Sequence, residues 1–182
     1  MNFCRLEDLA RLRVNPSLKR HSRVDSGASD TCALFTGNTR SVVSTDVGTR
    51  QVPYAWLENV VALRAGDVVI GNHLVSGAYP VYQVDVEDTP VFLAPHQTKV
   101  VPVSPRTNLS FLHWTITRSL FQSLQGVSEP PSELQLRTIR ELDLYWPDSS
   151  TQAAIIDEHQ RLSHQLRAAH EALISQREFF VL

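Results

Sequence analysis

Hydrophobic positions recur with two different periods along the chain, and the period changes near residue 108. Before that point, short runs rich in valine alternate with polar and turn-forming residues, a pattern typical of strands. We predict strands at residues 32–35, 41–43, 60–63, 67–70, 81–86, 91–94 and 98–103. Because the runs are short, β-branched and closely spaced, they favour a compact sheet that is largely antiparallel or mixed.

The segment after residue 108 has helical spacing instead. Leucine or isoleucine recurs every four residues from Leu112 to Leu124, which predicts an amphipathic helix packed on the sheet. Asn108 is the expected N-cap, and Gly126 can end the helix. Short apolar pieces follow and lead to Pro147.

The first residues of the chain also have helical spacing. Apolar side chains recur from Phe3 to Val14 with charged residues between them, so we predict a helix over residues 3–14. Pro16 ends this pattern, and the polar segment that follows is expected to be an exposed loop.

A long uninterrupted helix is predicted from Ser150 to about Phe180. Candidate caps are Ser149, Ser150 and Thr151. About 30 residues give a rod of roughly 45 Å, more than a small domain needs to cover its core. Its apolar seam repeats by four and three over about three and a half heptads, as in a coiled coil. The apolar seam residues are Ile155, Leu162, Leu166, Ala169, Leu173 and Phe180, with His159 and Gln176 as polar members.

The narrow seam favours an interface between helices, because the other faces of this segment are polar. The alternative is a helix that lies on its own domain. The sequence thus predicts an α+β fold: a compact mixed β-sheet domain with packed helices at residues 1–147, followed by one long coiled-coil helix at residues 148–182.

Charge argues against a protein that coats nucleic acid without regard to sequence. The formal net charge is only −2, whereas such proteins are usually basic. The basic residues are unevenly spread, however, and the sharpest cluster contains Lys19, Arg20 and Arg23, followed by Arg40. These residues are candidates for DNA contacts, and a solvated loop is the alternative.

A second group of candidate DNA contacts lies around the predicted loop after Ile70. Asparagine can read adenine, and lysine can read guanine. The group consists of Asn72, His73, Tyr79 and Lys99. For any one of them, an ordinary polar residue beside a strand is the alternative.

The sequence motifs of common catalytic sites are missing. The chain has no phosphate-binding glycine loop, zinc-protease motif or nucleophile elbow. His159, His164 and His170 share one predicted helix, but their spacing turns them about 140° and 120° apart, so they cannot ligate one metal. We therefore predict no enzyme, no metal and no cofactor. The one alternative is a metal-dependent nuclease.

The nuclease alternative depends on acidic residues near Asp85. Clustered carboxylates bind metal ions, and the candidates are Asp67, Asp85, Glu87 and Asp88 together with His73. The spacing of a nuclease motif is not matched, since Gln97 stands where an acidic residue should precede Lys99.

Cysteine usage and hydropathy indicate a cytoplasmic protein. Cys4 and Cys32 lack metal-type spacing, no signal peptide precedes them, and no apolar run approaches the ~20 residues of a membrane span. We predict free thiols, with a disulfide between the two as the alternative.

Several segments, in order, resemble the specificity subunits of type I restriction–modification systems. Residues 63–70, LRAGDVVI, resemble the L-x-x-G-D-[IV]-[LV]-[IV] element of the target-recognition domain. Residues 92–103 resemble the strand pair that follows, and residues 109–124 resemble the next helix. Residues 136–156 resemble the entry into the spacer helix, although its two prolines are reduced to Pro147.

This resemblance implies a function in DNA recognition. Specificity subunits of that family are not catalytic: their domains bind the major groove, and their helices form an antiparallel coiled coil that docks methyltransferase subunits. A full subunit has two recognition domains and two spacer helices, so this chain resembles half of one. The expected partners are double-stranded DNA, a second copy through the long helix, and a DNA methyltransferase subunit, with no membrane. A regulator or scaffold that keeps the fold but does not bind DNA is the alternative.

Overall fold

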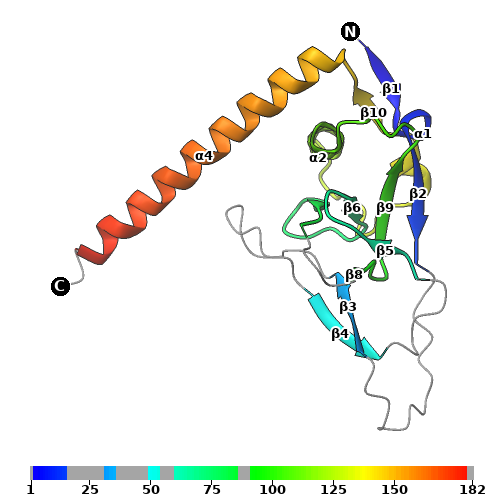
Figure 1. The fold of residues 1–182 in the computed structure, drawn as a ribbon, viewed down its shortest axis with the longest axis horizontal. Coiled ribbons are helices and arrows are strands. Elements are labelled where there is room, and N and C mark those ends of the chain that lie inside the picture. The colour runs from blue at the N-terminus through cyan, green and yellow to red at the C-terminus, as the bar shows by residue number, and fades with distance from the viewer. Residues whose placement is uncertain (1, 16–30, 36–48, 54–59, 86–90, 180–182) are drawn as a thin grey trace. The chain divides into compact units, whose positions relative to one another are not determined.

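The computed structural model describes residues 2–15, 31–35, 49–53, 60–85 and 91–179. They belong to two compact units, residues 1–146 and residues 147–182. The first contains all the described strands together with three helices, and the second is one long helix (Figure 1). The α+β fold class predicted from the sequence is confirmed.

The described strands of the first unit form three small sheets. The four-stranded sheet that organises the unit has the order β2 (Ala10–Val14), β9 (Gln97–Pro102), β6 (Val68–Gly71) and β7 (Val81–Gln83), all antiparallel. A two-stranded sheet pairs β1 (Phe3–Arg5) with β10 (Asp143–Tyr145). The remaining sheet has the order β4 (Thr49–Pro53), β3 (Thr31–Phe35), β8 (Val91–Phe92) and β5 (Ala62–Leu63). Its β3–β8 pair is parallel, so the predicted mixture of directions is present.

Strand β6 lies between two hydrophobic clusters. Successive side chains of a strand point to opposite faces, and here both faces are covered. Val68 and Ile70 pack into the cluster that includes the α2 side chains, whereas Val69 packs into the cluster around β3 and β8. All three side chains are fully buried. This explains the continuous apolar run in the sequence, which an alternating pattern would have broken.

Helix α2 (Leu109–Leu124) closes the first cluster. Its N-cap is Asn108, whose side chain accepts a hydrogen bond from the backbone N–H of Phe111. Leu112, Ile116 and Leu120 are buried, as their spacing of four predicted. Gly126 has a φ of 79°, a conformation that glycine adopts without strain just after a helix. The predictions for this helix and its cap are confirmed.

The predicted helix over residues 3–14 is wrong. The segment forms strand β1, one helical turn α1 (Leu6–Leu9) and strand β2. Leu6 and Ala10 are buried, but Phe3 and Val14, which extended the helical pattern, are exposed. The strands form because β10 and β9, distant in sequence, supply the hydrogen-bonding partners, and tertiary pairing overrides local spacing.

The other predicted strands have mixed outcomes. Strands β3, β6 and β9 agree with prediction, whereas those at residues 60–63, 81–86 and 91–94 are present but shorter. The predicted strand at 41–43 and the loop after Pro16 lie outside the described residues. Strand β4 was not predicted, and a short helix, α3 (Leu136–Arg140), lies just before β10.

The second unit is helix α4 (Ser149–Phe179), as predicted. Its cap is Asp148, one residue before the serines and threonine expected in that role. One Asp148 carboxylate oxygen accepts hydrogen bonds from the backbone N–H groups of Ser150 and Thr151, each at 3.0 Å. The predicted caps instead occupy the first turn of the helix. None of the helices among the described residues is long and apolar enough to cross a membrane.

Candidate DNA interface and partner helix

The four basic candidates for DNA contact, Lys19, Arg20, Arg23 and Arg40, lie outside the described residues. Their role stays a prediction. The other four candidates lie in the first unit, on or beside strands β6 and β9, and the structure describes the partners of each.

Lys99 is held inside the first unit by an ion pair. Its ammonium lies 2.5 Å from Asp67 Oδ2 and 3.0 Å from the backbone carbonyl of Ala62. The lysine side chain is 13% exposed and the aspartate side chain 19%. Asp67 also accepts a hydrogen bond from the backbone N–H of Arg64, which closes the turn before β6. This charge is therefore neutralised within the protein and contributes to joining β9 with the turn.

Asn72 and Tyr79 are buried as well. The side-chain amide oxygen of Asn72 accepts a 2.9 Å hydrogen bond from the hydroxyl of Thr98, which is itself fully buried. The Tyr79 hydroxyl donates to the backbone carbonyl of Pro131, and burial raises the pKa of this phenol. Both side chains thus support the fold. The Asn72 side-chain oxygen and the Tyr79 hydroxyl are engaged within the protein, and a base-reading role for either residue stays a prediction.

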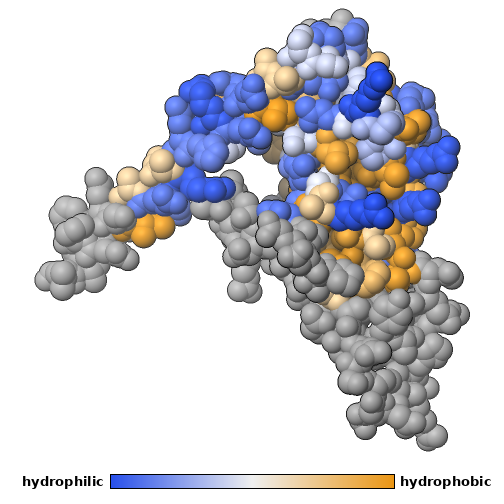
Figure 2. Space-filling model, in the orientation of Figure 1, coloured by the Kyte–Doolittle hydropathy of each residue, from blue (hydrophilic) through white to orange (hydrophobic). Residues whose placement is uncertain are grey.

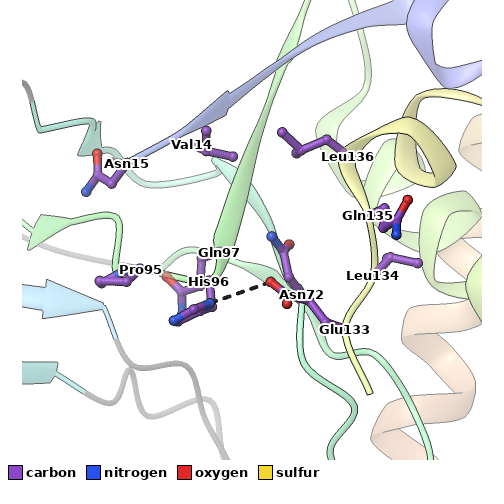
Figure 3. A pocket seen from close by; sticks show the side chains of 10 residues that line it. All are labelled: Val14, Asn15, Asn72, Pro95, His96, Gln97, Glu133, Leu134, Gln135 and Leu136. Atoms are coloured by element: carbon purple, nitrogen blue, oxygen red, sulfur yellow. Dashed lines mark ion pairs between the residues drawn. The ribbon is translucent and has the colours of Figure 1, made fainter. Parts of the chain in front are cut away.

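His73 is the exposed member of the second group. It belongs to a cluster with His96 and Glu133, in which one ligand-type atom from each residue lies within 4.8 Å of the others. The two imidazole rings have centroids 4.5 Å apart. His96 and Glu133 line a pocket of about 510 Å³, where Figure 3 draws their ion pair as a dashed line. Sequence reasoning missed His96 and Glu133, because nothing in the residue spacing connects positions 73, 96 and 133.

The acidic residues of the nuclease alternative are not gathered into one site among the described residues. Asp67 is bound to Lys99, and the cluster around His73 contains Glu133 rather than Asp85. Glu87 and Asp88 lie outside the described residues. Within the part of the chain that the structure describes, the geometry therefore gives this alternative no support.

Cys4 is a free thiol, so the alternative of a disulfide is wrong for this residue. Burial, followed by the carboxylates of Asp8 and Asp143, raises the pKa of the thiol. A thiol with a raised pKa is protonated at neutral pH and poorly reactive.

Helix α4 presents apolar side chains to solvent. Every residue from Asp157 to Ile174 is exposed. Leu162, Leu166 and Leu173 are 45%, 70% and 62% exposed. At about 100° per residue, these leucines, Ile155 and Ala169 fall within an arc of roughly 60° on the helix. We call these five residues the α4 stripe. Figure 2 shows apolar residues at the surface of this helix among hydrophilic ones.

Outside the α4 stripe the surface of α4 is mainly polar, although Ile174 is 47% exposed, and it carries an ion pair. Arg161 contacts Glu158 through two hydrogen bonds of 2.7 and 2.5 Å, one turn apart. This pairing lowers the pKa of Glu158. Such a pair stabilises an exposed helix without a partner. The charges of Glu158 and Arg161 are therefore satisfied within α4, whereas the leucines of the α4 stripe are exposed.

The architecture matches that of solved specificity subunits. The chain aligns with the S subunit of a type I restriction–modification system from M. genitalium at a TM-score of 0.57 and 12% identity, and with the HsdS subunit from Thermoanaerobacter tengcongensis at 0.56 and 15%. A chain from a structure on complex assembly and conformational transition of the type I R-M system gives a TM-score of 0.64 at 15% identity. No protein-family model and no curated protein matches the sequence.

These alignments include nearly all of this chain but less than half of each solved subunit. They cover 97%, 92% and 98% of this chain, and 42%, 39% and 43% of the respective subunit. The structural resemblance inferred from the sequence motifs is therefore confirmed, and the chain has the fold of about half a specificity subunit.

Proposed function

We propose that this protein recognises a specific double-stranded DNA sequence as a half-size specificity subunit. The observation that carries the proposal is the match, over nearly the whole chain, to about 40% of three solved subunits of type I restriction–modification systems. A match of this extent includes both the globular first unit of this chain and the long helix that follows it. The recognition surface belongs to the first unit, with the basic cluster at Lys19, Arg20 and Arg23 as its phosphate contacts.

The α4 stripe is proposed as the surface where two copies pair. An apolar strip of this length is unusual on a monomer and is typical of an interface. A second copy is the expected occupant because the stripe follows a heptad, which suits pairing with another helix of the same pattern. Two copies would supply two globular units and two helices.

Pairing determines the form of the DNA target. A two-fold symmetric dimer presents identical surfaces in opposite orientations, so its site is an inverted repeat with a spacer. The spacing between half-sites depends on the separation of the two globular units. As the resemblance implies, the paired helices would dock a DNA methyltransferase subunit, and chemistry on the DNA would belong to that partner. The protein itself would bind without catalysis or a cofactor.

Selection from a pool of random duplexes at low salt tests the proposal. The purified chain should enrich one bipartite inverted repeat, and the enriched duplex should bind at least a thousandfold more tightly than random DNA, as specific DNA-binding proteins do. The same selection is run with the methyltransferase encoded beside the gene, if one is present. Enrichment of no sequence in either form would contradict DNA recognition.

A second function, a scaffold that uses α4 without binding DNA, is favoured by one set of observations. The net charge is −2, and Lys99, Asn72 and Tyr79 are all occupied by internal bonds. Retention of the helix-mediated dimer, with no affinity for any duplex at low salt, would favour the scaffold over the first proposal.

A further inference from the structure

We propose that His73, His96 and Glu133 form a binding site for a divalent transition metal of the zinc type. The bound metal would connect three chain segments: the end of β6, the turn before β9, and the segment ahead of α3. This site lies wholly within the first unit and does not depend on DNA recognition.

The backbone places His73 and Glu133 side by side. The N–H of Leu74 donates to the carbonyl of Ser132 at 3.0 Å, and the N–H of Leu134 donates to the carbonyl of Asn72 at 2.7 Å. These two bonds flank an antiparallel bridge between His73 and Glu133. In such a non-hydrogen-bonded pair the facing residues are closest and their side chains stand on the same face. The pair is therefore held by main-chain geometry.

His96 is brought to the same place by a turn that is fixed at both ends. Its carbonyl accepts a 2.8 Å hydrogen bond from the N–H of Asn72. The side chain of Gln97 accepts a 3.1 Å bond from the N–H of Ala94, which closes the turn. His96 itself has a φ of 60°, which is uncommon for a residue other than glycine. A strained conformation of this kind persists where the surroundings impose it, often where a side chain must be aimed.

The donor atoms suit a transition metal better than calcium or magnesium. Two imidazole nitrogens and one carboxylate oxygen are a common zinc ligand set, whereas the harder cations prefer oxygen ligands throughout. Because the protein supplies three ligands, the fourth position of a tetrahedral site is left for water or another oxygen ligand. The geometry thus fits a three-ligand site that is open on one side.

The distances require only small side-chain movements. Metal–ligand bonds of about 2.0–2.2 Å place two ligands of a tetrahedral site roughly 3.3–3.6 Å apart. His96 Nδ1 already lies 3.6 Å from Glu133 Oε1, and the three ligand atoms lie within 4.8 Å of one another. All three side chains are exposed, so rotation about their side-chain bonds can close the remaining gap without disturbing the core.

Metal binding to chelator-treated full-length protein tests the site. Isothermal titration with Zn²⁺ should give one ion per chain. His73→Ala, His96→Ala and Glu133→Gln should each weaken binding about tenfold or more, because even residues behind the direct ligands commonly contribute 10–100-fold. At a hundredfold excess over Kd, Zn²⁺ should raise the Tm of the wild type by roughly 5 °C or more and that of His96→Ala by less.

The chain offers matched controls. His159→Ala and His170→Ala remove exposed histidines from α4, and both should leave the affinity for Zn²⁺ unchanged. X-ray absorption at the zinc edge should show two imidazole ligands and no sulfur. Circular dichroism confirms that each variant is folded, and Glu133→Gln preserves the shape of the side chain. Absence of binding, or binding that survives His73→Ala and His96→Ala, would overturn the proposal and leave only an ion pair between His96 and Glu133.

Discussion

The two units of this protein use their side chains in opposite ways. In the first unit, polar residues that look like ligands for DNA are occupied internally: Lys99 by Asp67, Asn72 by Thr98, and Tyr79 by Pro131. In α4, leucines of the kind that usually fill a hydrophobic core are exposed instead, and Leu166 is 70% exposed. A polar residue after a strand can therefore be structural, and an apolar residue on a long helix can be exposed rather than part of a core.

The largest effect is expected from charging the α4 stripe. Leu162→Asp combined with Leu166→Asp should abolish self-association, because burial of each leucine is worth about 1.5–3 kcal/mol and every dimer loses four of them. Sedimentation velocity measures the change in mass. The first unit should stay folded by near-ultraviolet circular dichroism, since both leucines are exposed.

The opposite face of the same helix provides the control. Gln160→Asp with His164→Asp adds two acidic residues at the same spacing but about 180° away from the stripe. This variant should associate like the wild type. If the leucine variant also unfolds the first unit, or if both variants dissociate equally, the stripe is not a pairing surface.

The next largest effect concerns the predicted phosphate contacts. Lys19→Ala with Arg20→Ala should reduce the slope of log affinity against log salt by about two units and weaken binding roughly 60-fold at 0.1 M salt, because two counterion-releasing contacts are lost. The loss should be similar for all duplex sequences. Arg161→Ala with Arg167→Ala on α4 is the control, and an unchanged slope after Lys19→Ala with Arg20→Ala would place Lys19 and Arg20 away from DNA.

A smaller effect is expected for Asn72, and it separates structure from base reading. Asn72→Ala leaves the fully buried Thr98 hydroxyl without its acceptor, which should lower the free energy of unfolding by about 1–3 kcal/mol in the absence of DNA. Chemical denaturation measures this change. Gln83→Ala, at an exposed position on β7, should cost less than about 0.5 kcal/mol. Unchanged stability with a loss restricted to the preferred duplex would instead support base reading.

The smallest effect concerns the start of α4. Hydrogen bonds from the hydroxyl of Ser150 and from Thr151 hold the pKa of Asp148 well below its usual range. Because the folded-state pKa is depressed, the cap stabilises the helix above pH ~4 and this contribution is lost as the pH falls through the folded pKa. Helix content by circular dichroism should show this decline. Asp148→Asn, which caps without titrating, should remove it, and an identical profile in both proteins would exclude Asp148 as its source.

Elements specified by local spacing were predictable, and those specified by distant partners were not. The four-residue period of α2 and the uninterrupted heptad of α4 lie within one segment each, so both helices follow from the sequence. Strands β1 and β2 depend on β10 and β9, and without those partners residues 3–14 have the spacing of a helix. Strand β4 was missed for a related reason. It forms by pairing with β3, and the residues of β4 alone do not have the pattern of a strand.

The same distinction applies to the candidate sites. The residues of the α4 stripe lie in one segment, so their spacing is visible in the sequence, and their role in pairing stays a prediction. The burial of Asn72 and Tyr79 depends on Thr98 and Pro131, which lie 26 and 52 positions away in the sequence, so both looked like loop residues. The cluster of His73, His96 and Glu133 forms only because β6, β9 and the segment before α3 meet, and no sequence motif spans them.

The stoichiometry of the protein on its selected duplex tests the central claim most directly. Sedimentation velocity of the purified chain with that duplex measures the mass of the complex. Pairing through α4 predicts two chains on one duplex that carries an inverted repeat, and a single chain on the same duplex after Leu162→Asp with Leu166→Asp. One wild-type chain per duplex, or no duplex that the protein prefers over random DNA, would contradict recognition by a paired half-size subunit.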